Sequence, residues 1–116
     1  MTKDSLILIG HVLECTELIE SYLKRFKNHD FFQEEWLQDM ITRRVEIIGE
    51  AVRNISPSIK KKYPDVEWHD IVGTRNILVH VYDAVDLDII WKIVKHKLPT
   101  LKKQMLHIKK DLEKNR

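Results

Sequence analysis

The 116-residue sequence contains little cysteine, glycine or proline, and each shortage excludes a class of protein. The single cysteine, Cys15, excludes an intrachain disulfide framework and a thiolate zinc cluster, and a lone helical cysteine usually fills a core position. Three glycines and three prolines exclude a fibrous or linker-rich chain. The early apolar stretch, residues 6–9, is too short for a signal peptide or a membrane span, so we expect a cytoplasmic protein with no membrane association.

An excess of one charge is also missing. The 20 basic residues are balanced by 18 acidic ones, and the net charge of +2 excludes a uniformly basic protein that coats nucleic acid. Affinity for RNA would have to come from a local patch. Lysines cluster at 60–62, 102–103 and 109–110. Such clusters are usually only solvated surface. If the protein acts on RNA, however, we expect these lysines to contact the phosphates of the RNA backbone.

Helical periodicity runs through almost the whole chain and predicts four long helices with short connections. We expect the first helix over 4–27, the second over 31–54, the third over 66–81 and the fourth from 87 onwards, with Asp30, Asp65 and Asp86 as N-caps of the last three. Ser56 and Pro57 predict a short helical turn that ends before Pro64. No strand pattern competes with these helices, so the sequence predicts one all-α domain over residues 1–116, an antiparallel bundle.

The fourth helix keeps its apolar spacing of three and four residues through Pro99. A proline inside a helix costs about 3 kcal/mol and kinks it. We therefore expect either one long helix bent at Pro99 or two abutting pieces that meet at Leu98. The charged tail, residues 109–116, is expected to fray.

The third helix departs from a simple apolar pattern at Arg75. Six residues lie within about 60° of Arg75 when each residue turns the helix by 100°: Trp68, Ile71, Val72, Leu78, Val79 and Tyr82. A buried guanidinium is costly unless it is paired. In a purely structural interpretation, the Arg75 side chain reaches solvent or pairs with a carboxylate in the core. In the alternative interpretation, Arg75 has a functional role.

A second stripe on the same helix contains His69, Gly73, Asn76 and His80 at spacings of four, three and four. A lone helical histidine is usually structural, but Arg, Asn and His together are what metal-free RNA cleavage needs. His80 would take the 2′-hydroxyl proton or protonate the 5′-leaving oxygen. Arg75 would neutralise charge on the phosphorane, and Asn76 would orient the histidine or the phosphate.

Residues 75–82 read R-N-x-x-x-H-x-Y, and this segment resembles the Arg-x4-His-x-Tyr motif of HEPN-domain proteins. The resemblance is closest to the HepT-like branch. Residues 43–51 resemble its second helix, residues 68–73 its W-x-x-I-x-G segment, and residues 86–98 its D-x-x-x-x-W-x-I-x-x-x-x-L-P segment. The resemblance covers residues 5–106, and the motif with three flanking blocks in order is far more specific than the motif alone.

The resemblance implies an all-α bundle that forms a homodimer and places two copies of the motif across one cleft. It implies a metal-independent endoribonuclease toxin of a type VII-like toxin–antitoxin pair. In this enzyme Arg75 and His80 would be catalytic and Asn76 would support them. The implied substrate is RNA, and tRNA is one candidate. The implied partner is an MntA-like nucleotidyltransferase antitoxin that attaches AMP to Tyr82. The alternative is a non-catalytic helical module that binds a nucleotidyltransferase partner.

Six histidines raise the possibility of zinc, but their spacing does not favour a site. His69 and His80 are eleven residues apart on one helix, which is about 16 Å along its axis. The other histidines, at 11, 29, 96 and 107, have no second histidine at tight ligand spacing. We therefore expect no metal site and no cofactor.

Overall fold

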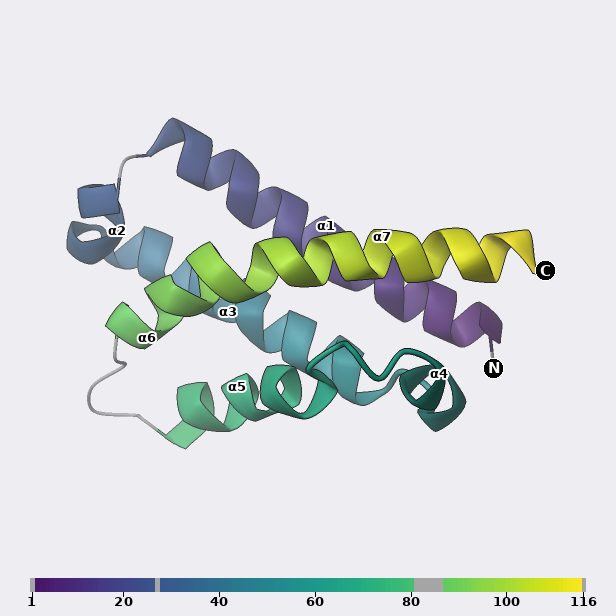
Figure 1. Cartoon of the computed structure of the whole chain (residues 1–116). Helices are drawn as coiled ribbons and strands as arrows, with labels where there is room; N and C mark the ends of the chain where they lie inside the picture. Colours follow the sequence, from purple (N-terminus) through teal and green to yellow (C-terminus); the bar gives the residue numbers. More distant parts are fainter. Residues whose placement is uncertain (1, 27, 81–86, 116) are drawn as a thin grey trace.

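The computed structural model of the chain describes residues 2–26, 28–80 and 87–115, and the side chains of residues 2–3, 28–29 and 75–80 are outside this description. Within these ranges the chain is helical and contains no strand. Four helices, α1 (Thr2–Arg25), α3 (Glu35–Arg53), α5 (Trp68–His80) and α7 (Leu98–Lys114), alternate in direction along the molecule (Figure 1). The antiparallel all-α bundle expected from the sequence is thereby confirmed.

The core is built from the apolar stripes of α1, α3 and α7, and these stripes follow the predicted periodicity. The most deeply buried positions include Ile9, Val12 and Ile19 on α1, Leu37, Ile41 and Ile48 on α3, and Leu101, Met105 and Ile108 on α7. Each such side chain contributes about 1.5–3 kcal/mol by leaving water. Helix α5 packs against α3, so the motif helix is carried on one side of this core.

Cys15 occupies a core position, as its helical setting predicted. Burial raises the pKa of the Cys15 thiol, and the guanidinium of Arg44 on α3 offsets part of that increase. A neutral buried thiol is a poor nucleophile, so Cys15 serves packing rather than chemistry.

The second predicted helix is divided, and the expectation that Asp30 is its N-cap is wrong. Asp30 lies inside a separate helix, α2 (Asn28–Gln33), and the backbone of Glu34 is extended between α2 and α3. The break lets Phe31 become fully buried, with its ring 5.1 Å from that of Trp91. The side-chain amide of Gln38 donates a 2.9 Å hydrogen bond to the Phe31 carbonyl and holds the turn.

The connection between α3 and α5 contains the short helix α4 (Pro57–Lys62), as Ser56 and Pro57 predicted. The Ser56 hydroxyl accepts a hydrogen bond of 3.4 Å from the backbone N–H of Ile59, and Pro57 is the first helical residue. Asp65 does not cap the next helix, because α5 begins only at Trp68. The predicted N-cap at Asp86 lies outside the described residues.

The last long helix is continuous through Pro99, and a π-helical segment absorbs the proline. Helix α6 (Leu87–Lys92) leads through the π-helix η1 (Ile93–Lys97) directly into α7, where Pro99 lies in the first turn. The backbone N–H of Leu98 donates to the carbonyl of Ile93, five residues earlier. Since a proline has no N–H to donate, this wider turn immediately before it lets the helix continue without losing its apolar phase.

Helix α7 extends through the charged segment that we expected to fray. It runs to Lys114, Leu112 is buried, and Asp111 accepts a hydrogen bond from Tyr63. In the part of the chain that the structure describes, no helix combines the length and apolarity needed to cross a membrane.

Candidate functional site

Helix α5 carries the first part of the predicted motif, and its start is fixed by Trp68. The indole Nε1 of Trp68 donates a 2.9 Å hydrogen bond to the Tyr63 carbonyl, and the backbone N–H of Trp68 donates to the Val66 carbonyl at 2.8 Å. The Trp68 ring is half-buried against the core. Because successive residues of a helix turn by 100°, this anchor determines the rotational setting of α5.

The first half of the stripe predicted around Arg75 lies where α5 meets the core. Ile71 is buried, and Trp68 and Val72 are half-buried against core residues. Thr74 is also buried, and its hydroxyl donates a 2.6 Å hydrogen bond to the Ile71 carbonyl. The backbone of Arg75 follows directly after this packed segment in the same helix.

The second predicted stripe, which begins with His69 and Gly73, lies along a groove. Both residues line a cavity between α5 and the α6–η1 segment, with His69 exposed and Gly73 half-buried. A Cβ atom placed on Gly73 would meet no other atom within 4 Å, so the space beside it is open. The backbone of Asn76 and His80, the next members of the stripe, continues the same helix.

The groove has a volume of about 710 Å³, and its two walls come from distant parts of the sequence. The wall on α5 consists of His69, Asp70, Gly73 and Thr74. The opposite wall consists of Ile89, Lys92, Ile93, His96 and Lys97, from α6 and η1. Ligand sites usually enclose roughly 300–1,000 Å³, so the groove is large enough for a small molecule or for one unit of a polymer.

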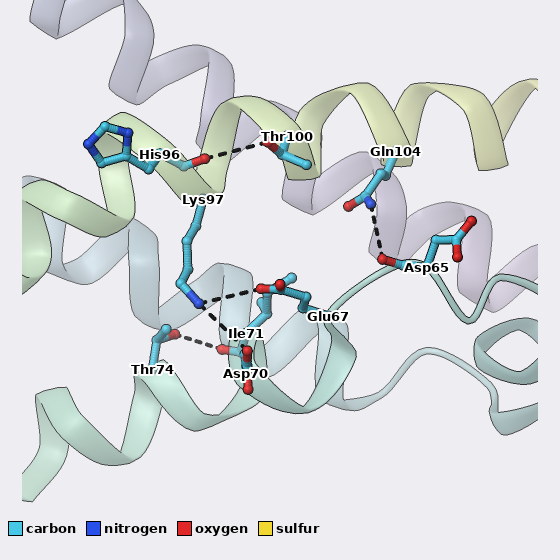
Figure 2. A network of polar contacts seen from close by, with 9 residues as sticks. All are labelled: Asp65, Glu67, Asp70, Ile71, Thr74, His96, Lys97, Thr100 and Gln104. Carbon is cyan, nitrogen blue, oxygen red and sulfur yellow. Dashed lines mark hydrogen bonds and ion pairs between the residues drawn. The ribbon is translucent and has the colours of Figure 1, made fainter.

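Lys97 joins the two walls at the end of the groove nearest the start of α5. Figure 2 shows its side chain reaching from η1 to the carboxylates of Glu67 and Asp70, with Nζ–O distances of 3.5 and 3.7 Å. All three side chains are largely exposed, so these ion pairs orient the two segments more than they stabilise the fold. No pattern in the sequence indicates a role for Lys97, or for the groove residues Lys92 and His96 as a set.

A second polar cluster ties the segment before α5 to α7. The Tyr63 hydroxyl donates a 2.7 Å hydrogen bond to Asp111, and His107 lies 3.4 Å from the same carboxylate. Burial and the hydrogen bond to Asp111 raise the pKa of Tyr63 to about 12. The same hydrogen bond, with the nearby charge of His107, lowers the pKa of Asp111.

The structure also brings together parts of two basic clusters found in the sequence. Lys62 and Lys103 line one pocket of about 350 Å³, together with His107. Lys102 is not free for a ligand, because it forms a 2.9 Å ion pair with Glu20 on α1. The lysines at 62 and 103 are therefore the members of the predicted clusters that the fold gathers on one surface.

The predicted catalytic residues are only partly within the described structure. Arg75, Asn76 and His80 have helical backbones on α5, and their side chains are among those outside the description. Tyr82 lies outside the described residues altogether. Among the described residues, no group of three His, Cys, Asp or Glu side chains is arranged to hold a metal ion.

Comparison with known proteins identifies the family. The sequence profile of the ribonuclease HepT-like family matches residues 12–108, which contain both walls of the groove and the complete motif. The chain belongs to this family. The match covers most of the region in which the sequence resembled the HepT-like branch, and it confirms that resemblance.

The chain is also similar to several individual proteins. It is 42% identical over its full length to a Methanocaldococcus jannaschii protein named as a gamma-glutamylcyclotransferase and putative RNase, and it spans about half (52%) of that relative. A second protein of the same organism, named as a putative RNase, is 34% identical over 89% of this chain and 94% of its own length. The probable ribonuclease HepT of Thermococcus cleftensis is 34% identical over 85% of this chain and 90% of its own length.

No solved structure matches the HepT-like chain. The names of the family and of its relatives support a ribonuclease function.

Proposed function

We propose that the chain is a metal-independent endoribonuclease in which Arg75 and His80 are catalytic and Asn76 supports them. The observation that carries the proposal is that all three positions lie on one continuous helix, α5, whose setting is fixed by Trp68 and which borders an open groove. Membership of the ribonuclease HepT-like family supports the same reaction.

The proposed reaction needs no group beyond the chain and its RNA. His80 takes the proton from a ribose 2′-hydroxyl, the 2′ oxygen attacks the adjacent phosphorus, and the 5′ oxygen leaves as it gains a proton. Arg75 stabilises the extra negative charge that builds on the phosphorane, and Asn76 orients the imidazole or the phosphate. The leaving 5′ oxygen takes its proton from solvent, to which His80 returns the proton that it removed. In our proposal a second copy of the chain, related by a two-fold axis, completes the site by placing Arg75 of one protomer beside His80 of the other.

We further propose that the enzyme is a cytoplasmic toxin controlled by a nucleotidyltransferase antitoxin. The antitoxin would transfer AMP from ATP to the hydroxyl of Tyr82, two residues after His80, and release pyrophosphate. A bulky anion close to the motif would compete with the RNA phosphate for Arg75. The sequence motif R-N-x-x-x-H-x-Y supports this control because it places the tyrosine beside the proposed catalytic pair.

The products of the reaction test the proposed chemistry. Purified protein in EDTA should cleave RNA to fragments with 2′,3′-cyclic phosphate and 5′-hydroxyl ends. An otherwise identical RNA with a 2′-deoxyribose at the mapped position should resist cleavage there. Cleavage that requires an added divalent ion, or that continues at the deoxy position, would contradict the mechanism. A wild-type protein that binds a nucleotidyltransferase but never cuts RNA would favour the non-catalytic module.

A further inference from the structure

The groove between α5 and the α6–η1 segment combines an apolar floor with a basic rim. Ile93 is buried in the floor, and Gly73 contributes no side chain there. The hydroxyl of Thr74 is already bonded to the Ile71 carbonyl of its own helix. The floor therefore offers an apolar contact surface and little competition for hydrogen bonds.

The rim of the groove carries basic side chains on the wall opposite α5. Lys92 and His96 line the groove, and both side chains are exposed. The acidic lining residue, Asp70, is already paired with Lys97 at the end of the groove. The wall opposite α5 therefore offers basic side chains, Lys92 and His96, to an anionic group of a ligand.

A ligand that fits this groove has a flat apolar part and an adjacent anionic part. A nucleotide has both, in its base and its phosphate, and its size suits a volume of about 710 Å³. The groove begins on the stripe of α5 that continues, by helical spacing, to Asn76 and His80. A polymer that occupies the groove would therefore extend along the motif helix.

We infer that this groove binds one nucleotide of the RNA substrate next to the cleaved bond, with its base against Gly73 and Ile93 and its phosphate toward Lys92 and His96. This inference rests on the proposed ribonuclease function. It adds a substrate subsite outside the motif, and it assigns a role to Gly73, Lys92 and His96 that the motif does not supply.

The sequence offers a matched pair of glycines to test it. A Cβ atom would meet nothing within 4 Å at either Gly73, in the groove, or Gly10, on α1, so both helical positions accept a side chain. Gly73→Leu should fill the groove and raise the KM for a short RNA at least tenfold, while kcat changes less. Gly10→Leu should leave both constants unchanged. Lys92→Ala, which removes a cation without filling space, should also raise KM and reduce its dependence on salt.

Direct binding separates this inference from the proposed function. The probe is 5′-AMP on the His80→Ala protein, followed through the methyl NMR signals of Ile89 and Ile93. We expect these signals to shift with 5′-AMP, much less with ribose 5-phosphate, and not at all in the Gly73→Leu variant, and we expect a short single-stranded RNA to displace the nucleotide.

Two results would overturn the subsite, and each is distinct from failure of the enzyme. If wild-type protein cuts RNA but Gly73→Leu and Lys92→Ala keep the wild-type KM, the RNA does not use the groove. If 5′-AMP shifts the methyl signals but RNA never displaces it, the groove is a site for free nucleotides. A protein that never cuts RNA but shows the expected RNA-displaceable binding would contradict the proposed function and leave the groove as an RNA site.

Discussion

Tyr63 and Asp111, 48 residues apart in the sequence, are joined by a 2.7 Å hydrogen bond that ties the start of the motif helix to α7. The Tyr63 carbonyl also accepts the hydrogen bond from Trp68 that fixes where α5 begins. The same residue thus connects the motif helix to the core through its main chain and its side chain. Tyr63 therefore helps to fix the position at which α5 begins.

Tyr63→Phe should destabilise the fold in a pH-dependent way. The raised pKa of Tyr63, about 12 against an ordinary 10, means that the hydroxyl contributes its full stability below pH 10 and loses it between pH 10 and 12. The lowered pKa of Asp111 has the opposite sense, so its contribution is present at neutral pH and is lost as the carboxylate is protonated in acid.

Chemical denaturation of wild type and Tyr63→Phe from pH 7 to pH 12 tests this relationship. The difference in unfolding free energy between the two proteins should be constant up to about pH 10 and shrink above it. Tyr22→Phe is the control, because Tyr22 packs through its ring against Phe26 and Trp36. A Tyr63→Phe difference that stays unchanged through pH 12 would show that the hydroxyl is not held as described.

A composite site makes a quantitative prediction for mixed dimers. If each site takes Arg75 from one protomer and His80 from the other, an Arg75→Ala chain paired with a His80→Ala chain retains one intact site. Half of the dimers are mixed after random exchange, so the mixture should recover about a quarter of the wild-type activity.

Each variant alone is inactive whether the two catalytic residues of a site come from one protomer or from two. Only the activity of the mixture therefore distinguishes these two arrangements. The two variants should be unfolded together and refolded, and sedimentation should show dimers at tens of micromolar. No recovery in a dimeric mixture would place both residues of each site on one chain. A monomer that nonetheless cuts RNA at full rate would remove the need for a partner protomer.

Control through Tyr82 predicts a defined change in mass. A cognate nucleotidyltransferase with ATP and Mg²⁺ should add one or more AMP groups to the chain, and cleavage should fall in proportion. Tyr82→Phe should remain active and unmodified, whereas Tyr63→Phe should still be modified. Mass spectrometry that finds the adduct on another residue, or a Tyr82→Phe protein that the partner and ATP still silence, would exclude this mechanism.

The packing of the long helices could be predicted from the sequence because it depends on local periodicity. The stripes that contain Ile9, Ile41 and Met105 are buried as their spacing of three and four required. The division at Glu34 could not be predicted in this way, because it depends on Phe31 packing against Trp91, sixty residues later. Asp30 has the residue type and local position of an N-cap, but the contact between Phe31 and Trp91 places it inside α2.

The candidate site shows the same limit. Arg75, Asn76 and His80 could be chosen from the sequence because one short motif contains them. Lys92 and His96 could not, because each is an exposed helical residue that reads as part of a solvated face. Only the meeting of α5 with α6 and η1 makes them one wall of a groove. The sequence did contain one indication of η1. The apolar spacing of the last helix continues undisturbed through Pro99, and this requires an unusual turn near the proline.

The rate of RNA cleavage by His80→Ala in EDTA tests the central claim most directly. His11→Ala is the matched control, because His11 is an exposed histidine on α1, a different helix. Both proteins should keep the helical content and dimeric state of wild type. We expect His11→Ala to cleave at the wild-type rate and His80→Ala to be slower by about a hundredfold or more, because it lacks the acid–base group. A folded, dimeric His80→Ala protein that cuts RNA at the wild-type rate would contradict the account.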